Sequence, residues 1–102
     1  MSTHELIRPD GALPVTLYEP PPGEARVPAL LVIPSIFGVG DDLEEQMQSL
    51  AKRGALVAAI DPFWRISPGP LPYSEADHAI ERMQQLDKVA AYDDVRAAAN
   101  WL

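Results

Sequence analysis

The first residues of the chain form two short extended runs that are separated by turn-forming residues. Residues 4–8 and residues 13–19 flank Pro9-Asp10-Gly11, whose composition is typical of a tight turn. In the second run Val15 and Leu17 are two positions apart, so they share one face of a strand. This pattern predicts a β-hairpin at the start of the chain.

A continuous hydrophobic run follows a loop rich in proline. Residues 20–28 hold four prolines and a glycine, which predicts a surface loop and excludes a central strand. Residues 29–33 are all hydrophobic and predict a fully buried strand. A helical segment separates this run from a second buried strand over residues 55–60, so a βαβ unit with two parallel strands is expected. The hydrophobic residues of that helix recur at helical spacing, at Leu43, Met47 and Leu50.

Capping residues predict where the helices begin and end. Asp41 is the expected N-cap of the first helix, with Glu44 completing a capping-box pattern, and Gly54 is expected to close it. Ser74 is expected to cap a second helical region. Because an unbroken helix from there to the last residue would be long for a globular domain, we expect a break near Asp87, which would cap another helix.

Proline and glycine divide the chain better than charge does. All eleven prolines lie at or before Pro72 and all six glycines at or before Gly69, whereas the residues after them are strong helix formers. The last helix is expected to present a hydrophobic face made of Val89, Tyr92, Val95, Ala99 and Leu102. We expect one α/β domain over residues 1–102, with a hairpin and loop (1–28), a βαβ unit (29–61), a loop (62–73) and a helical region (74–102).

Composition narrows the classes of protein to which the chain can belong. Its 102 residues suffice for one small domain, and 47% hydrophobic with 23% charged residues is ordinary for a globular protein. There is no cysteine, so disulfides and a thiol nucleophile are excluded within the chain. The net charge of −7 disfavours binding to nucleic acid or to an anionic membrane. No signal sequence or membrane span is visible, so a cytoplasmic location is expected.

Side chains that could form a catalytic triad are few. Ser35 follows the first buried strand, where α/β folds place their active loops, but it lacks the flanking glycines of a nucleophile elbow. His4 lies in a terminal strand and His78 in an exposed helix, so both are expected at the surface. A complete triad within these residues is therefore not expected, and Ser35 is only a weak candidate nucleophile.

The glycine-containing loop after the same strand has two interpretations. The loop Ile36-Phe37-Gly38-Val39-Gly40 lacks the spacing of a phosphate-binding loop. Its backbone amides could serve as an oxyanion hole, or its glycines could simply permit a tight turn. Asp61, at the end of the second strand, is expected to cap its own loop. The adjacent acidic residues are expected on solvated helix faces, namely Asp41-Asp42, Glu44-Glu45 and Asp93-Asp94.

Arg65 is the charged residue with the greatest functional interest. It follows Phe63 and Trp64 in the loop after the second strand, where an arginine could bind the carboxylate of a substrate. The alternative is a structural arginine that stacks on Trp64 or pairs with an acidic residue.

Two segments in this order resemble the dienelactone hydrolase family, which has the α/β-hydrolase fold. The first segment runs from Pro28 to Gly38 and ends in Ser35-Ile36-Phe37-Gly38, and the second runs from Gly54 to Arg65 and contains Asp61-Pro62-Phe63-Trp64-Arg65. The family has a Glu-Ile-Phe-Gly-type loop, a helix, Gly-Tyr-x-Val, and then Pro-Asp-Leu-Tyr/Phe with a nearby arginine. The resemblance covers essentially the whole chain and implies a three-layer arrangement of sheet and helices.

The resemblance implies roles for some residues of this chain, whereas the family's nucleophile, acid and histidine have no matching residue in it. It implies that the Ile36 amide forms half of an oxyanion hole and that Arg65 holds a substrate carboxylate, with Phe37 and Trp64 beside the substrate. Ser35 stands where the family has the glutamate that helps to activate its thiol. The family's nucleophile elbow, acid and histidine come after the part that corresponds to Leu102, so the chain resembles an N-terminal half.

The function expected from this resemblance is therefore incomplete. We expect a half domain of an ester or lactone hydrolase that is inactive alone and needs no metal or cofactor. Its exposed sheet edge would be covered by a second copy of the chain or by a chain that supplies the C-terminal half. Two alternatives remain: a non-catalytic, self-associating protein, and a module that binds small carboxylates.

Overall fold

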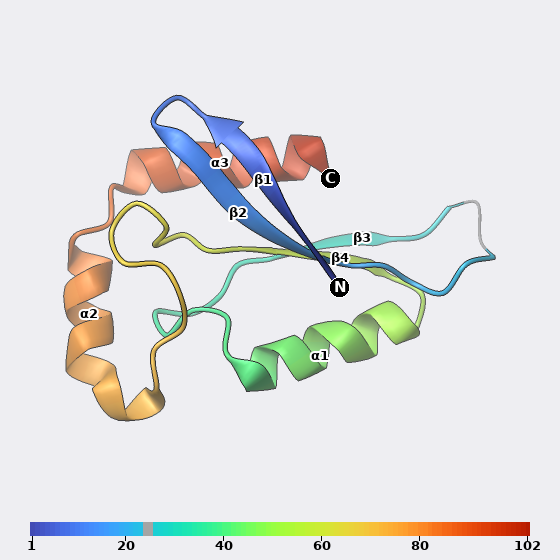
Figure 1. The fold of residues 1–102 in the computed structure, drawn as a ribbon, viewed down its shortest axis with the longest axis horizontal. Helices are drawn as coiled ribbons and strands as arrows, with labels where there is room; N and C mark the ends of the chain where they lie inside the picture. Colours follow the sequence, from blue (N-terminus) through green and yellow to red (C-terminus); the bar gives the residue numbers. More distant parts are fainter. Residues whose placement is uncertain (24–25) are drawn as a thin grey trace.

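The computed structural model describes residues 1–23 and 26–102. Its elements follow the predicted order of a hairpin, a βαβ unit and a helical region (Figure 1). They are β1 (Ser2–Arg8), β2 (Gly11–Tyr18), β3 (Ala29–Val32), α1 (Asp41–Lys52), β4 (Leu56–Ile60), a 3₁₀ turn η1 (Tyr73–Glu75), α2 (Ala76–Gln84) and α3 (Lys88–Trp101). The predicted loop over residues 20–28 connects β2 to β3, and residues 24 and 25 lie outside the described residues.

The four strands form one mixed sheet in the order β1-β2-β4-β3. β1 and β2 pair antiparallel as the predicted hairpin, and β2 continues antiparallel onto β4, with Val15 opposite Ile60. β3 and β4 pair parallel, with Leu31 opposite Ala58. The predicted βαβ unit is confirmed, and the hairpin extends its sheet on the β4 side.

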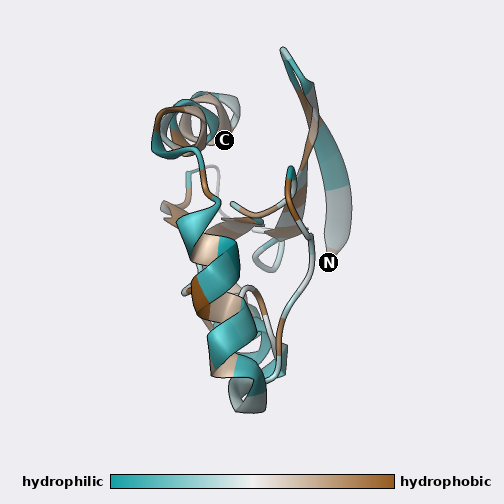
Figure 2. Cartoon of the chain, turned by 90° about the vertical axis from the view of Figure 1, so that its left-hand side faces the viewer, coloured by the Kyte–Doolittle hydropathy of each residue, from teal (hydrophilic) through white to brown (hydrophobic). Residues whose placement is uncertain are grey.

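Helices cover both faces of the sheet, so the molecule has three layers (Figure 1). On one face Met47 and Ala51 of α1 pack with Val57 and Ala59 of β4. On the other face Ala98 of α3 packs against the opposite side of the same strands. Figure 2 shows the hydrophobic colour concentrated on the strands between these layers. The three-layer α/β class is therefore confirmed.

The prediction that β3 is fully buried is wrong. β3 is an edge strand, with Leu30 39% exposed and the following Ile33 53% exposed. Its hydrophobic sequence satisfies the pattern of an interior parallel strand, but only β4 pairs with it among the described residues. An edge of this kind presents unpaired backbone groups and hydrophobic side chains to solvent.

The predicted caps are correct at one of three helix starts. α1 begins after Gly40 and α2 after Glu75, and neither has a side-chain cap, so the capping roles predicted for Asp41 and Ser74 are wrong. A short 3₁₀ turn precedes α2 and takes in Ser74, which moves the start of that helix beyond the expected position. At α3 the Asp87 carboxylate accepts hydrogen bonds from two backbone amides, as predicted.

The hydrophobic faces of the helices are rotated from the predicted ones. On α3 Val89 is 73% and Tyr92 72% exposed, whereas Asp94 and Ala98 are buried. Val95 and Leu102 of the predicted face do pack against the core, but a charged interaction under the helix, described below, places Asp94 beside them. On α1 Met47 is buried as predicted, but Leu50 is 38% exposed and Ala51 takes the inward position.

Replacing the cap of α3 should destabilise the protein. Asp87→Ala removes the acceptor for the Val89 and Ala90 amides, and we expect a loss of about 1 kcal/mol in the free energy of unfolding. Ser74→Ala is the matched control, because Ser74 makes no capping bond, and it should change stability by less than about 0.5 kcal/mol. Urea denaturation followed by circular dichroism measures both. Equal effects of the two variants would contradict the assignment.

Candidate functional site

The loop after β3 is a tight turn in which the amides of Phe37 and Gly38 are engaged and that of Ile36 is not, among the described residues. The Gly38 amide donates to the Ser35 carbonyl at 3.0 Å, and the Phe37 amide donates to the Ser35 hydroxyl oxygen at 3.3 Å. Gly38 has a φ of +79°, and a Cβ there would lie 3.1 Å from the Gly69 carbonyl oxygen. Glycine is thus required both by the backbone conformation and by the close approach of the next loop.

The Ile36 amide fits the requirement for an oxyanion donor. Among the described residues it has no hydrogen-bond partner, while the two amides that follow it in the turn are engaged. Ser35 and Ile36 line a cavity of about 520 Å³ at the end of β3, whose far wall includes Met83, Tyr92 and Val95. A free amide beside a hydrophobic cavity can stabilise developing negative charge on a bound carbonyl oxygen.

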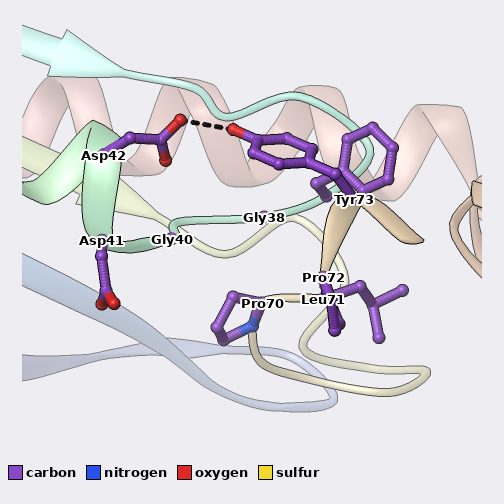
Figure 3. A pocket seen from close by; sticks show the side chains of 9 residues that line it. Gly38, Gly40, Asp41, Asp42, Pro70, Leu71, Pro72 and Tyr73 are labelled. Carbon is purple, nitrogen blue, oxygen red and sulfur yellow. Dashed lines mark hydrogen bonds between the residues drawn. The ribbon is translucent and has the colours of Figure 1, made fainter. Parts of the chain in front are cut away.

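Phe37 belongs to a second cavity on the other side of this loop (Figure 3). That cavity also measures about 520 Å³ and lies between the start of α1 and residues 70–73. The Tyr73 hydroxyl donates to the Asp42 carboxylate across it, and the Phe37 and Tyr73 rings meet edge to face with centroids 4.8 Å apart. This bond lowers the pKa of Asp42 and raises the pKa of Tyr73, because it favours a charged carboxylate and a neutral phenol.

Arg65 is engaged by two carboxylates. Its Nη1 donates to Asp94 Oδ2 at 2.7 Å and its Nη2 to Asp94 Oδ1 at 3.0 Å, while Nε and Nη2 donate to Asp10. The guanidinium also stacks over the Trp64 ring at 4.3 Å from the centroid. Both carboxylates raise the pKa of Arg65, so the side chain remains charged. This geometry is the structural arrangement considered above as the alternative to substrate binding.

Asp94 is the residue of this cluster that sequence reasoning missed. It was expected on a solvated helix face, yet its side chain is fully buried and accepts from Arg65, Arg8 and Trp64. Burial alone would raise the pKa of Asp94, but the hydrogen bonds from Arg65 and Trp64 outweigh it and the pKa is lowered. Only its place in the middle of the hydrophobic pattern of α3 could have marked it as inward-facing.

The remaining candidate residues have local roles. The Asp61 carboxylate accepts from the amides of Phe63 at 2.9 Å and Gly69 at 2.8 Å, so it organises its own loop as predicted. His4 lies against Trp101, and His78 lies 3.9 Å from the Glu75 carboxylate. Neither histidine bonds to Ser35 among the described residues.

The predicted site residues therefore do not form one site. Ser35 and Ile36 line the cavity at the end of β3, Phe37 lines the neighbouring one, and Arg65 and Trp64 line neither. No cluster of three or more potential metal ligands occurs within the described ranges. In the same part of the chain, no helix has the length and hydrophobicity needed to cross a bilayer.

Comparison with known proteins identifies the fold. No family model matches the chain, and no curated protein matches it in sequence. Among solved structures, the chain superimposes with a TM-score of 0.82 on a protein from Klebsiella pneumoniae subsp. pneumoniae MGH 78578 that is provisionally described as a dienelactone hydrolase. The chain therefore shares its fold with part of a protein that carries this description. The match covers 98% of this chain but only 42% of the dienelactone-hydrolase-like protein, at 19% sequence identity.

The buried carboxylate of Asp94 should make a large contribution to stability that depends on pH. Asp94→Asn leaves Arg8 and Arg65 without their shared charge, and we expect a loss of about 3 kcal/mol at pH 7. Because the pKa of Asp94 is lowered in the folded state, this contribution is complete above the unfolded pKa of about 4 and falls as the pH drops below it.

The adjacent residue provides a matched control for this measurement. Asp93 is exposed on the same helix, so Asp93→Asn should change the free energy of unfolding little at any pH. Urea denaturation of both variants and the parent between about pH 3 and 7 gives the comparison. A difference between Asp94→Asn and the parent that is small at pH 7, or that grows as the pH falls, would contradict the assignment.

Proposed function

We propose that the chain supplies the oxyanion loop of an ester or lactone hydrolase. The observation that carries this proposal is the Ile36 amide, which has no partner among the described residues and lies beside a cavity at the carboxyl end of β3. Active sites of α/β folds lie at this end of the parallel strands. The likeness to a solved structure described as a dienelactone hydrolase supports the reaction class. The nucleophile, acid and base come from residues outside this chain.

The exposed edge and cavity support completion of the fold by further residues. Ile33, Met83 and Tyr92 all line the cavity beside Ile36, and each is at least 42% exposed. A strand paired to the free edge of β3 would cover these side chains and satisfy the backbone groups of the edge. The matched structure is more than twice as long as the part that this chain covers, so it contains enough residues to provide such a strand.

The substrate-side roles of Arg65, Trp64 and Phe37 receive less support. Four N–H bonds of Arg65 already go to Asp10 and Asp94, and Trp64 also donates to Asp94. A substrate carboxylate could reach Arg65 only by replacing Asp10, whose side chain is 55% exposed. Phe37 faces a different cavity from Ile36. We therefore base the proposal on the Ile36 amide alone and not on carboxylate recognition, which also removes support from the carboxylate-binding module.

A second function is favoured by the same exposed surface. A non-catalytic protein could cover the edge of β3 with another copy of itself, because an edge strand can pair with the same edge of a second molecule. Self-association and hydrolysis make opposite predictions about the composition of the particle. Native mass spectrometry separates them, since the first requires only copies of this chain and the second requires further residues.

Removing the Ile36 amide should abolish most of the hydrolytic activity. Ile36 occupies the second position of the turn from Ser35 to Gly38, where proline is well tolerated, so Ile36→Pro deletes the N–H and keeps the turn. We expect kcat for a short acyl ester to fall about 100- to 1,000-fold. The assay uses the complete assembly, or the longer polypeptide where the chain is part of one.

The control for this experiment changes the side chain and keeps the amide. Ile36→Val should retain kcat within about threefold, because an oxyanion donor of the backbone does not depend on the side chain. No ester hydrolysis by the complete assembly would overturn the proposed function. Equal activity of Ile36→Pro and Ile36→Val would remove the amide from the mechanism.

A charge at the uncovered edge should disrupt whatever packs there. The structure favours Ile33 as the site for this test, since Ile33 is 53% exposed whereas Val32 packs against the core beneath α1. We expect Ile33→Lys to dissociate the assembly in native mass spectrometry while leaving the thermal unfolding of the chain itself nearly unchanged. Ile7 is 77% exposed on β1, the strand at the other edge of the sheet, so Ile7→Lys should leave the assembly intact. Dissociation by both variants would point to a nonspecific assembly.

A further inference from the structure

Arg82 is a buried cation whose donors go to the backbone. It lies on α2 with only 2% of its surface exposed. Among the described residues no carboxylate lies within 4.0 Å of it, and its Nε has no hydrogen-bond partner. Burial lowers the pKa of Arg82, because the charged form loses its hydration. A buried charge of this kind is costly, so the contacts that hold it must compensate.

The compensating contacts come from two loops that are distant in the sequence. Nη2 donates to the Ile36 carbonyl at 2.8 Å, and Nη1 donates to the carbonyls of Ser67 at 2.9 Å and Gly69 at 2.7 Å. The Phe63 ring lies under the guanidinium, 4.1 Å from its centroid. The planar fork of arginine can hold both loops at once, which the single ammonium of lysine does not do.

These bonds act directly on the turn that presents the Ile36 amide. The carbonyl that Arg82 holds belongs to Ile36 itself, and the turn is closed by the bond from Gly38 to Ser35. A further bond, from the Leu71 amide to the Phe37 carbonyl at 2.8 Å, ties the turn to the second loop. The Arg82 bond fixes the peptide plane between Ile36 and Phe37, and the bond from Gly38 to the Ser35 carbonyl fixes the preceding plane, which carries the Ile36 N–H. Without Arg82 the turn that keeps both planes in place loses its charge-assisted hydrogen bond.

We propose that Arg82 is a positioning residue. Its hydrogen bond to the Ile36 carbonyl stabilises the turn, and the turn keeps the Ile36 amide in the orientation needed to bind an oxyanion. The catalytic consequence of this inference rests on the proposed function, but the hydrogen bonds of Arg82 to the loops are a property of the folded chain. Arg82 does not touch the substrate. It acts through the backbone of the loop and couples that loop to residues 67–69.

The test replaces the guanidinium by an uncharged side chain that still covers Phe63. In Arg82→Met the backbone amide resonances of Ile36, Phe37 and Gly38 should move, and hydrogen exchange of the Gly38 amide should accelerate about tenfold or more. Amides in the middle of α1 and β4 should keep both their resonances and their exchange rates, whereas a general loss of stability would accelerate exchange there as well. Arg96→Met is the matched control, because Arg96 is exposed on α3, and it should leave the loop unchanged.

A second variant keeps the charge and changes the geometry. Arg82→Lys cannot bridge Ile36 and Gly69 simultaneously, so the same three resonances should move in the same direction by a smaller amount. If Arg82→Met does not fold, this variant decides the matter by itself. Loop resonances and exchange rates equal to those of the parent in Arg82→Lys would overturn the proposal.

The kinetic consequence separates this inference from the proposed function. In the complete hydrolase Arg82→Met should lower kcat about 10- to 100-fold with KM nearly unchanged. A displaced amide stabilises the transition state less, whereas it changes the affinity for the substrate little. A complete assembly without hydrolytic activity would refute the proposed function and leave the spectroscopic result standing. Displaced loop resonances with an unaltered kcat would refute the positioning role.

Discussion

One buried carboxylate joins three parts of the fold that are far apart in the sequence. Asp94 of α3 accepts from Arg8 at the end of β1, and from Trp64 and Arg65 in the loop after β4. The hairpin, the loop and the last helix therefore meet at a single anion. Because removing one partner would leave the others charged or unpaired in a site of low solvent access, this cluster strongly constrains how α3 packs on the sheet.

Arg65 and Arg82 solve the burial of a guanidinium in different ways. Arg65 has two carboxylates and remains partly exposed, so its role in the structure is to neutralise Asp94 and Asp10. Arg82 is almost completely buried and holds three backbone carbonyls instead. Carbonyl dipoles compensate a charge less fully than a carboxylate does, so the charge of Arg82 is compensated less fully than that of Arg65. The arginine that contacts the turn after β3 is thus a different one from the arginine that the sequence motif marks.

The exposed edge of β3 and the cavity beside Ile36 lie together. β3 has hydrophobic residues typical of an interior strand, yet it lies at the edge of the sheet, and the cavity beside Ile36 is bounded by exposed hydrophobic side chains. The solved structure that shares this fold is more than twice as long as the matched part. A strand added at this edge would pair with β3 and cover the exposed side chains beside the cavity.

Local chemistry determined the elements of this protein from its sequence. Turn residues, continuous hydrophobic runs and the cap at Asp87 predicted the hairpin, the βαβ unit and the break before α3, because each depends on neighbouring residues. Tertiary structure decided which residue of each helix faces inward and where each charge is paired. Asp94, Arg82 and Arg65 find their partners between 13 and 86 positions away, and hydrophobic periodicity carries no information about contacts at that range.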